Sequence, residues 1–119
     1  LKQAINKLDG LHVIGDEETP GQQASHYCLV VRFDKALAQH RAAIIPAMNE
    51  KGRGTSIYYP NPVPMMSYYK DKYGYKKEQF PVASSIAYDS IALPVGPHLE
   101  SDDLSYISDS LSQVIQNCS

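Results

Sequence analysis

The chain has 119 residues, of which 43% are hydrophobic and 20% charged, and its formal net charge is −2. This length fits a single domain that can bury a core, and the composition excludes a disordered or low-complexity chain. A near-neutral charge provides no positive field for binding phosphate backbones, so nucleic acid is not an expected partner. The apolar runs are much shorter than the roughly 20 residues of a membrane-spanning helix, so no membrane span is expected.

The chain has few residues that form disulfides or bind metals. Its two cysteines, Cys28 and Cys118, lie far apart in the sequence, which favours a reducing cytoplasm over a disulfide framework. The four histidines are scattered, and none lies at metal-ligand spacing from another candidate ligand, so no metal site is predicted. Because the sequence starts at Leu1 and not at Met, we expect a trimmed start or a piece of a longer protein.

The first 33 residues predict a helix tail, a loop and a strand. In residues 1–9 the apolar residues recur at helical spacing, and Gly10 suits a helix C-terminus. The polar segment 12–25 contains glycine and proline breakers and predicts a loop. The segment 26–33, HYCLVVRF, is nearly continuous in apolar and β-branched residues, which is typical of a strand covered on both faces.

A helix and a proline-rich loop are expected next. Asp34 can cap a helix over 35–51, where Pro46 lies in the interior and predicts either a kink or two short helices. The β-prone segment 55–59 predicts a short strand. Alternating prolines in YPNPVP, residues 59–64, fix the backbone φ angle and predict a stiff loop.

The C-terminal half predicts three helices and one short strand. A short helix over 64–73 closes at Gly74, and a second runs over 81–90. The apolar run 91–93 predicts a strand, and Ser101 can cap a final amphipathic helix whose first turn holds two aspartates. Together these elements indicate an α+β fold, with helices packed on a small antiparallel or mixed sheet.

Tyrosine is the most unusual feature of the composition. Six of the nine tyrosines lie between residues 58 and 75. One interpretation is that these amphipathic rings pack a small subdomain while their hydroxyls reach water. The other is that Tyr58 and Tyr59, where the predicted strand enters the proline loop, line a site, since flat apolar faces with hydroxyl groups suit sugars and phosphates. Composition alone favours the packing interpretation.

Two further sequence features have ordinary structural interpretations. Lys70, Lys72, Lys76 and Lys77 form a basic cluster beside acidic neighbours, which is typical of a solvated face, although such a cluster can also attract a diphosphate. GRGTS, residues 52–56, lacks the third glycine and the preceding strand of a dinucleotide-binding fingerprint. We interpret it as a helix end before a strand.

Motifs in a fixed order resemble one enzyme family. GRGTSIYYPNPVP, residues 52–64, contains a G-x-G-T strand start and an aromatic Y-P loop. GYKKEQFPVASSIAYDSIALPVGPHL, residues 74–99, contains a G-Y-x(4)-F-P-x-A helix entry and an L-P-x-x-P-x-L turn. With the closing helix, they resemble the C-terminal part of DegT/StrS-type nucleotide-sugar aminotransferases, which are fold-type-I enzymes that use pyridoxal phosphate. The resemblance runs from about Ser25 to Ile115.

This resemblance implies a considerably longer enzyme. Residues 11–119 are implied to form its C-terminal small domain, and residues 1–10 the tail of an inter-domain helix. Pyridoxal phosphate and its lysine are implied to lie mainly in an absent N-terminal domain, because none of the eight lysines here has a matching context, so the chain alone is expected to be inactive. The intact enzyme is implied to be a cytoplasmic homodimer that moves an amino group from a glutamate-type donor to a nucleotide-linked keto-deoxysugar.

The resemblance implies which residues of this chain contact the substrate. It implies no catalytic residue and no cofactor-binding residue. The family often has His where Tyr58 stands, in a loop that approaches the sugar, so Tyr58, Tyr59 and Asn61 are implied to bind the substrate. A further His of the family matches Pro64 here, which removes one polar contact. Two alternatives stay open: a stand-alone α+β binding module, and a structural or dimerisation domain without catalytic activity.

Overall fold

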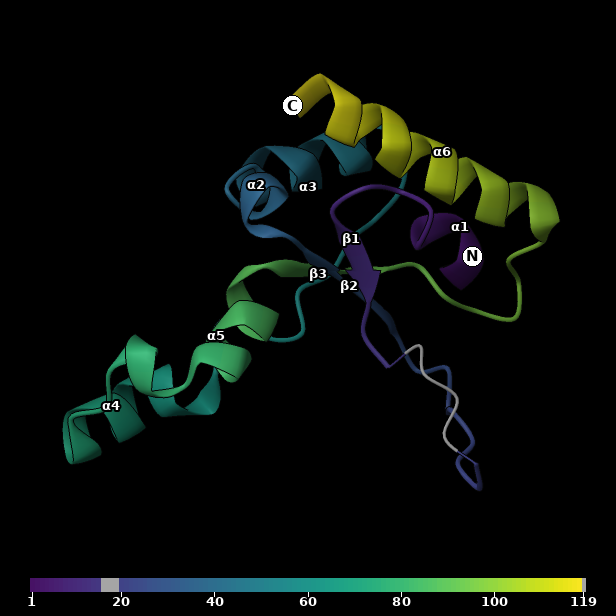
Figure 1. Cartoon of the computed structure of the whole chain (residues 1–119). Coiled ribbons are helices and arrows are strands. Elements are labelled where there is room, and N and C mark those ends of the chain that lie inside the picture. Colours follow the sequence, from purple (N-terminus) through teal and green to yellow (C-terminus); the bar gives the residue numbers. More distant parts are fainter. Residues whose placement is uncertain (16–19, 119) are drawn as a thin grey trace.

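A three-stranded antiparallel sheet organises the computed structural model, which describes residues 1–15 and 20–118 (Figure 1). The sheet and the helices around it confirm the predicted α+β fold. In chain order the elements are α1 (Lys2–Ile5), β1 (Leu11–Val13), β2 (Leu29–Phe33), α2 (Lys35–Ala38), α3 (Arg41–Glu50), the 3-10 turn η1 (Val63–Met65), α4 (Ser67–Tyr73), the 3-10 turn η2 (Lys77–Gln79), α5 (Pro81–Tyr88), β3 (Ser90–Leu93) and α6 (Ser101–Cys118).

The central strand β2 is covered on one face. It pairs antiparallel with β1 on one side and with β3 on the other. Leu29, Val31 and Phe33 are buried, whereas Arg32 is exposed. The prediction of a strand covered on both faces is therefore wrong for β2, and β3 is the strand that is buried throughout. The predicted start at residue 26 is also wrong, because His26 has a positive φ of 53°, which a strand does not adopt.

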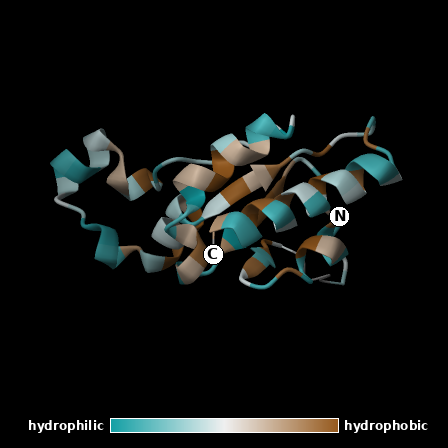
Figure 2. Ribbon diagram, turned by 90° about the horizontal axis from the view of Figure 1, so that it is seen from above, coloured by the Kyte–Doolittle hydropathy of each residue, from teal (hydrophilic) through white to brown (hydrophobic). Residues whose placement is uncertain are grey.

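Helix α6 closes the hydrophobic core over the sheet. Ile107, Leu111 and Val114 recur at helical spacing and are buried, as are Ile44 and Met48 of the neighbouring helix α3. Figure 1 shows α3 beneath α6, and in Figure 2 the outward side of α6 is mostly hydrophilic. The two aspartates of the first turn suit the positive end of the helix dipole. The amphipathic pattern thus predicted both the helix and its buried face.

The predicted helix over 35–51 consists of two helices, one of the two outcomes expected there. Asp34 caps α2, because its Oδ1 accepts a hydrogen bond from the Leu37 backbone N–H at 3.0 Å. The interruption between the two helices lies at residues 39–40, however, and not at Pro46, which lies inside α3. Pro46 and the residue four positions earlier, Ala42, are both exposed, so water can solvate the carbonyl that the missing N–H leaves unpaired.

Three other elements differ from prediction. Strand β1 lies in part of the predicted loop 12–25, and three residues are too few to show an alternating pattern. The N-terminal helix covers only Lys2–Ile5, not residues 1–9. The predicted strand 55–59 is a single bridge between Ser56 and Ala92, because the prolines that follow cannot donate to a ladder.

Residues 57–88 form an arm that projects from the core (Figure 1). The predicted helix over 64–73 is a 3-10 turn followed by α4, which ends at Gly74 with a positive φ of 65°. The next helix, α5, starts with Pro81 in its first turn, as predicted. The two 3-10 turns and α4 contain no buried residue, so this outer part of the arm has no hydrophobic core of its own.

Candidate functional site

The loop that carries the predicted substrate residues starts at the β3 edge of the sheet. Ser56 and Ala92 exchange backbone hydrogen bonds of 3.1 and 2.7 Å, which fixes the start of the loop. Pro62 is buried at its other end, and the peptide bond between Tyr58 and Tyr59 is cis. The loop is therefore held at both ends while its middle faces solvent.

Three tyrosine rings gather at this loop. The centroids of Tyr58 and Tyr59 lie 5.8 Å apart in an edge arrangement, and Tyr27 lies 6.2 Å from Tyr58. Tyr58 is 38% exposed and Tyr59 70% exposed, so both rings and their hydroxyls are accessible to a ligand. Sequence reasoning did not single out Tyr27, because it precedes the loop by about 30 positions in the chain and only the fold brings it close.

Asn61 is exposed, and its side chain is oriented by a neighbouring helix. The Tyr88 hydroxyl, at the last residue of α5, donates to Asn61 Oδ1 at 3.2 Å. A ligand at the loop would therefore meet an amide group whose direction is set by Tyr88. The structure thus brings Tyr58, Tyr59 and Asn61 onto one short loop and adds Tyr27 and Tyr88 around it.

The remaining tyrosines of the arm stack on one another. Tyr69, Tyr73 and Tyr75 form successive ring contacts with centroid distances of 6.4 and 5.3 Å, and Phe80 continues the row at 5.1 Å from Tyr75. Tyr73 is nevertheless 53% exposed. This arrangement agrees with the interpretation in which amphipathic rings pack a small subdomain and leave their hydroxyls in water.

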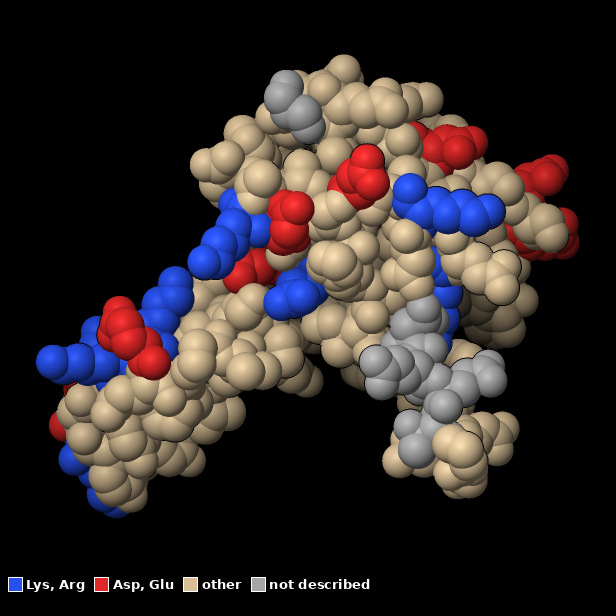
Figure 3. All heavy atoms as spheres, viewed as in Figure 1, with Lys and Arg blue, Asp and Glu red and all other residues tan. Residues whose placement is uncertain are grey.

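The basic cluster of the arm is a solvated face. Lys70, Lys72, Lys76 and Lys77 are exposed, and in Figure 3 blue side chains gather along the outer edge of the arm. Lys72 Nζ lies 5.3 Å from the Tyr68 ring centroid and donates to the Tyr68 hydroxyl at 3.1 Å. Lys72 and Lys77 therefore lie over tyrosine rings, while all four lysines stay in contact with solvent.

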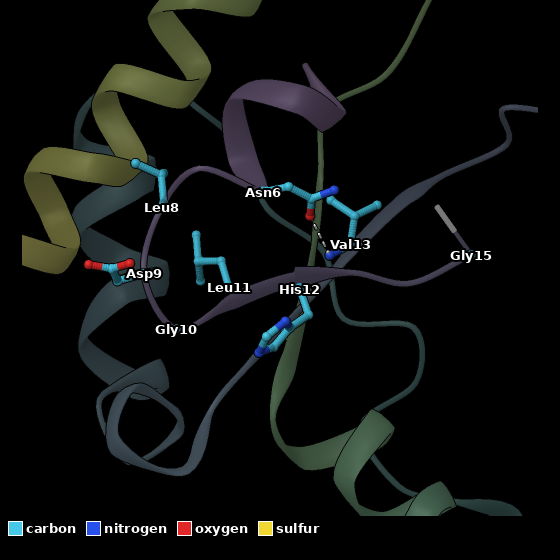
Figure 4. A pocket seen from close by; sticks show the side chains of 8 residues that line it. All are labelled: Asn6, Leu8, Asp9, Gly10, Leu11, His12, Val13 and Gly15. Atoms are coloured by element: carbon cyan, nitrogen blue, oxygen red, sulfur yellow. Dashed lines mark hydrogen bonds between the residues drawn. The ribbon is translucent and has the colours of Figure 1, made fainter. Parts of the chain in front are cut away.

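A cavity of about 600 Å³ lies at the opposite edge of the sheet, between α1 and β1 (Figure 4). Asp9 and His12 line it, but Figure 4 shows their side chains pointing in different directions. Asn6, also in its lining, uses Oδ1 to accept a hydrogen bond from the Val13 backbone N–H at 3.2 Å. This cavity holds no converging catalytic groups, and β2 and β3 separate its strand from the tyrosine loop.

A second cavity, of about 550 Å³, lies at the base of the arm and is lined by side chains of both charge signs. Ser85 Oγ donates to Asp89 Oδ2 at 2.8 Å, and Ser84 Oγ donates to the Lys77 carbonyl at 3.2 Å. Nearby, burial lowers the pKa of the Arg41 guanidinium, and the Asp89 carboxylate partly opposes that shift. Ser84, Ser85 and Asp89 therefore bond within the protein, while Arg32, Lys35 and Glu78 also line this cavity.

Neither a metal nor pyridoxal phosphate fits the described residues as they stand. Across residues 1–15 and 20–118, no three His, Cys, Asp or Glu side chains are grouped to hold a metal ion. Pyridoxal phosphate needs a lysine in an enclosed pocket, yet none of the eight lysines is buried.

Cys28 and Cys118 are both free thiols. Among the described helices, none has the length and apolar character to cross a bilayer.

The curated proteins that this chain resembles include one from polysaccharide biosynthesis. The spore coat polysaccharide biosynthesis protein SpsC of Bacillus subtilis is 27% identical over 97 residues, which is 81% of this chain and 25% of SpsC. The chain thus spans about a quarter of the length of the curated relatives it matches.

Solved structures show the same fold. PseC of Helicobacter pylori, an aminotransferase involved in pseudoaminic acid biosynthesis, superposes with a TM-score of 0.84 at 11% identity, over 98% of this chain and 30% of PseC. A Streptococcus pneumoniae protein described as a sugar aminotransferase, in its PLP form, gives a TM-score of 0.77 at 22% identity, over 91% of this chain and 27% of that protein. The same protein is also known in its PMP form.

A sequence model of the family settles the membership. The model of the DegT/DnrJ/EryC1/StrS aminotransferases matches residues 1–112, which is nearly the whole chain. This confirms the resemblance noted in the proline loop and the α5 entry. The chain belongs to the DegT/DnrJ/EryC1/StrS aminotransferase family.

Proposed function

We propose that the chain is the C-terminal domain of a PLP-dependent sugar aminotransferase. In this proposal residues 11–119 form the domain and residues 1–10 the end of an inter-domain helix. The intact enzyme moves an amino group from a glutamate-type donor to a keto-deoxysugar linked to a nucleotide, and this chain alone is inactive. The observation that carries the proposal is the family match over residues 1–112.

The cofactor and its lysine belong, in this proposal, to a domain outside these residues. The accessible apolar surface of the arm supports that division: Met66, Tyr68 and Tyr73 are 52%, 63% and 53% exposed, and soluble proteins usually cover such patches with another domain or subunit. We assign the intact enzyme to the cytoplasm as a homodimer; the two free thiols are in keeping with a reducing compartment.

The chain contributes substrate binding and not chemistry. A sugar ring has apolar faces rimmed by hydroxyls, and the accessible rings of Tyr58 and Tyr59 offer a matching flat face with a polar edge. Asn61 adds an amide that can donate to a sugar oxygen. The loop thereby orients the acceptor and covers one wall of the cleft, which helps to exclude water.

Separate measurement of the two half-reactions in the full-length enzyme tests this proposal. Tyr58→Phe keeps the ring and removes the hydroxyl, so we expect kcat/KM for the keto-sugar half-reaction to fall roughly tenfold, while the amino-donor half-reaction stays unchanged. Tyr73→Phe on the arm is the matched control, since its ring is also exposed and also contacts other tyrosine rings. An equal fall in both half-reactions would show that Tyr58 packs and does not recognise the sugar.

A further inference from the structure

The loop with Tyr58 and Tyr59 is tied at both ends to one short stretch of chain. Its start is bound to Ala92 of β3 through the backbone of Ser56. Its end is bound through Asn61 to the hydroxyl of Tyr88. Residues 88 and 92 flank the junction between α5 and β3, so this junction carries both anchors of the loop.

Tyr88 is itself held through its ring and through its backbone. Lys77 Nζ lies 4.5 Å from the centroid of its ring, within the range of a cation–π interaction. Arg41 of α3 donates from Nη1 to the backbone carbonyls of Ala87, at 3.0 Å, and of Tyr88. These contacts hold the end of α5, and with it the hydroxyl that reaches Asn61.

We propose that Tyr88 is a positioning residue for the substrate loop. Its hydroxyl holds Asn61, and through Asn61 it restricts how far the Tyr58 and Tyr59 rings can move from the core. Tyr88 acts through Asn61 and needs no contact with the sugar. The role in catalysis rests on the proposed function, whereas the mechanical tie between helix and loop is independent of it.

The test uses Tyr88→Phe in the full-length protein. This change removes the hydroxyl and keeps the ring on which Lys77 lies. The matched control is Tyr106→Phe, since the Tyr106 hydroxyl is also exposed and donates at 3.3 Å to the carbonyl of Lys51, a residue outside the loop. Its ring stays under the Arg53 guanidinium, 4.1 Å from the centroid.

The first readout needs no activity. Chymotrypsin cleaves after aromatic residues, and its rate at Tyr58 follows the fraction of molecules with an open loop. We expect Tyr88→Phe to raise cleavage at Tyr58, relative to cleavage at Tyr69, by roughly three- to tenfold, the change that one lost hydrogen bond produces. Tyr106→Phe should leave that ratio unchanged. An unchanged ratio in both variants would overturn the proposal.

A double-mutant cycle with Asn61→Ala supplies the second readout. If the two side chains act as one tie, Tyr88→Phe changes the cleavage ratio in the wild type and not in Asn61→Ala; additive effects would refute the tie. In an active enzyme, Tyr88→Phe should raise KM for the keto sugar by a similar factor and spare the donor half-reaction. An enzyme with no keto-sugar activity would refute the proposed function while the cleavage cycle still decides the role of Tyr88.

Discussion

Replacing Arg41 with methionine should loosen the arm from the core. Arg41 donates from Nη1 to the carbonyls of Ala87 and Tyr88, which are among the last of α5 and have no partner within the helix. A hydrogen bond to a charged group contributes about 1.5–3 kcal/mol to the free energy of unfolding. Burial of the Arg41 guanidinium, which lowers its pKa, removes part of its hydration and offsets part of this gain. We therefore expect Arg41→Met to lower the free energy of unfolding by about 2 kcal/mol.

The measurement is thermal unfolding followed by circular dichroism, alongside Arg32→Met. Arg32 is an exposed arginine on β2, so its replacement should change stability by less than about 0.5 kcal/mol. For a domain of this size, 2 kcal/mol corresponds to a fall in Tm of roughly 8 °C. If the two variants unfold within a degree of each other, Arg41 does not hold α5 as described.

Two further pairs of variants test the core and the turn before β1. Leu111→Ala, at a fully buried site in α6, should lower the free energy of unfolding in urea by about 3 kcal/mol. Asp109→Ala, on the exposed face of the same helix, should lower it by less than about 0.5 kcal/mol. Gly10→Ala should destabilise more than Gly15→Ala: both glycines have positive φ, but only at Gly10 would a Cβ lie 2.8 Å from a Leu37 side-chain carbon. Equal costs within either pair would contradict the packing described.

Local chemistry made the helices of the C-terminal half predictable. Pro81 in the first turn, Gly74 after α4 and the amphipathic pattern of α6 each act within a few residues, and the structure has these elements where the sequence predicts them. The break between α2 and α3 was misplaced because Pro46 lies on a solvated side of the helix. The loss of stability that a proline causes inside a helix thus depends on whether water can reach the carbonyl that the proline leaves unpaired.

Contacts between distant segments could not be predicted in the same way. Strand β1 exists because Leu11 and Val13 pair with β2, and three residues leave no periodic signal. In the candidate site, the family resemblance pointed to Tyr58, Tyr59 and Asn61, but Tyr27 and Tyr88 join them only through the fold. A single tyrosine in a sequence gives no indication of which residue its hydroxyl will reach.

The central claim is that these residues shape the acceptor side of an enzyme whose reactive lysine lies elsewhere. The most direct test is borohydride reduction of the dialysed full-length holoenzyme, followed by peptide mapping of the pyridoxyl-lysine. We predict one labelled lysine per subunit, in a peptide outside residues 1–119. Stoichiometric labelling of any of the eight lysines within this chain would contradict the claim.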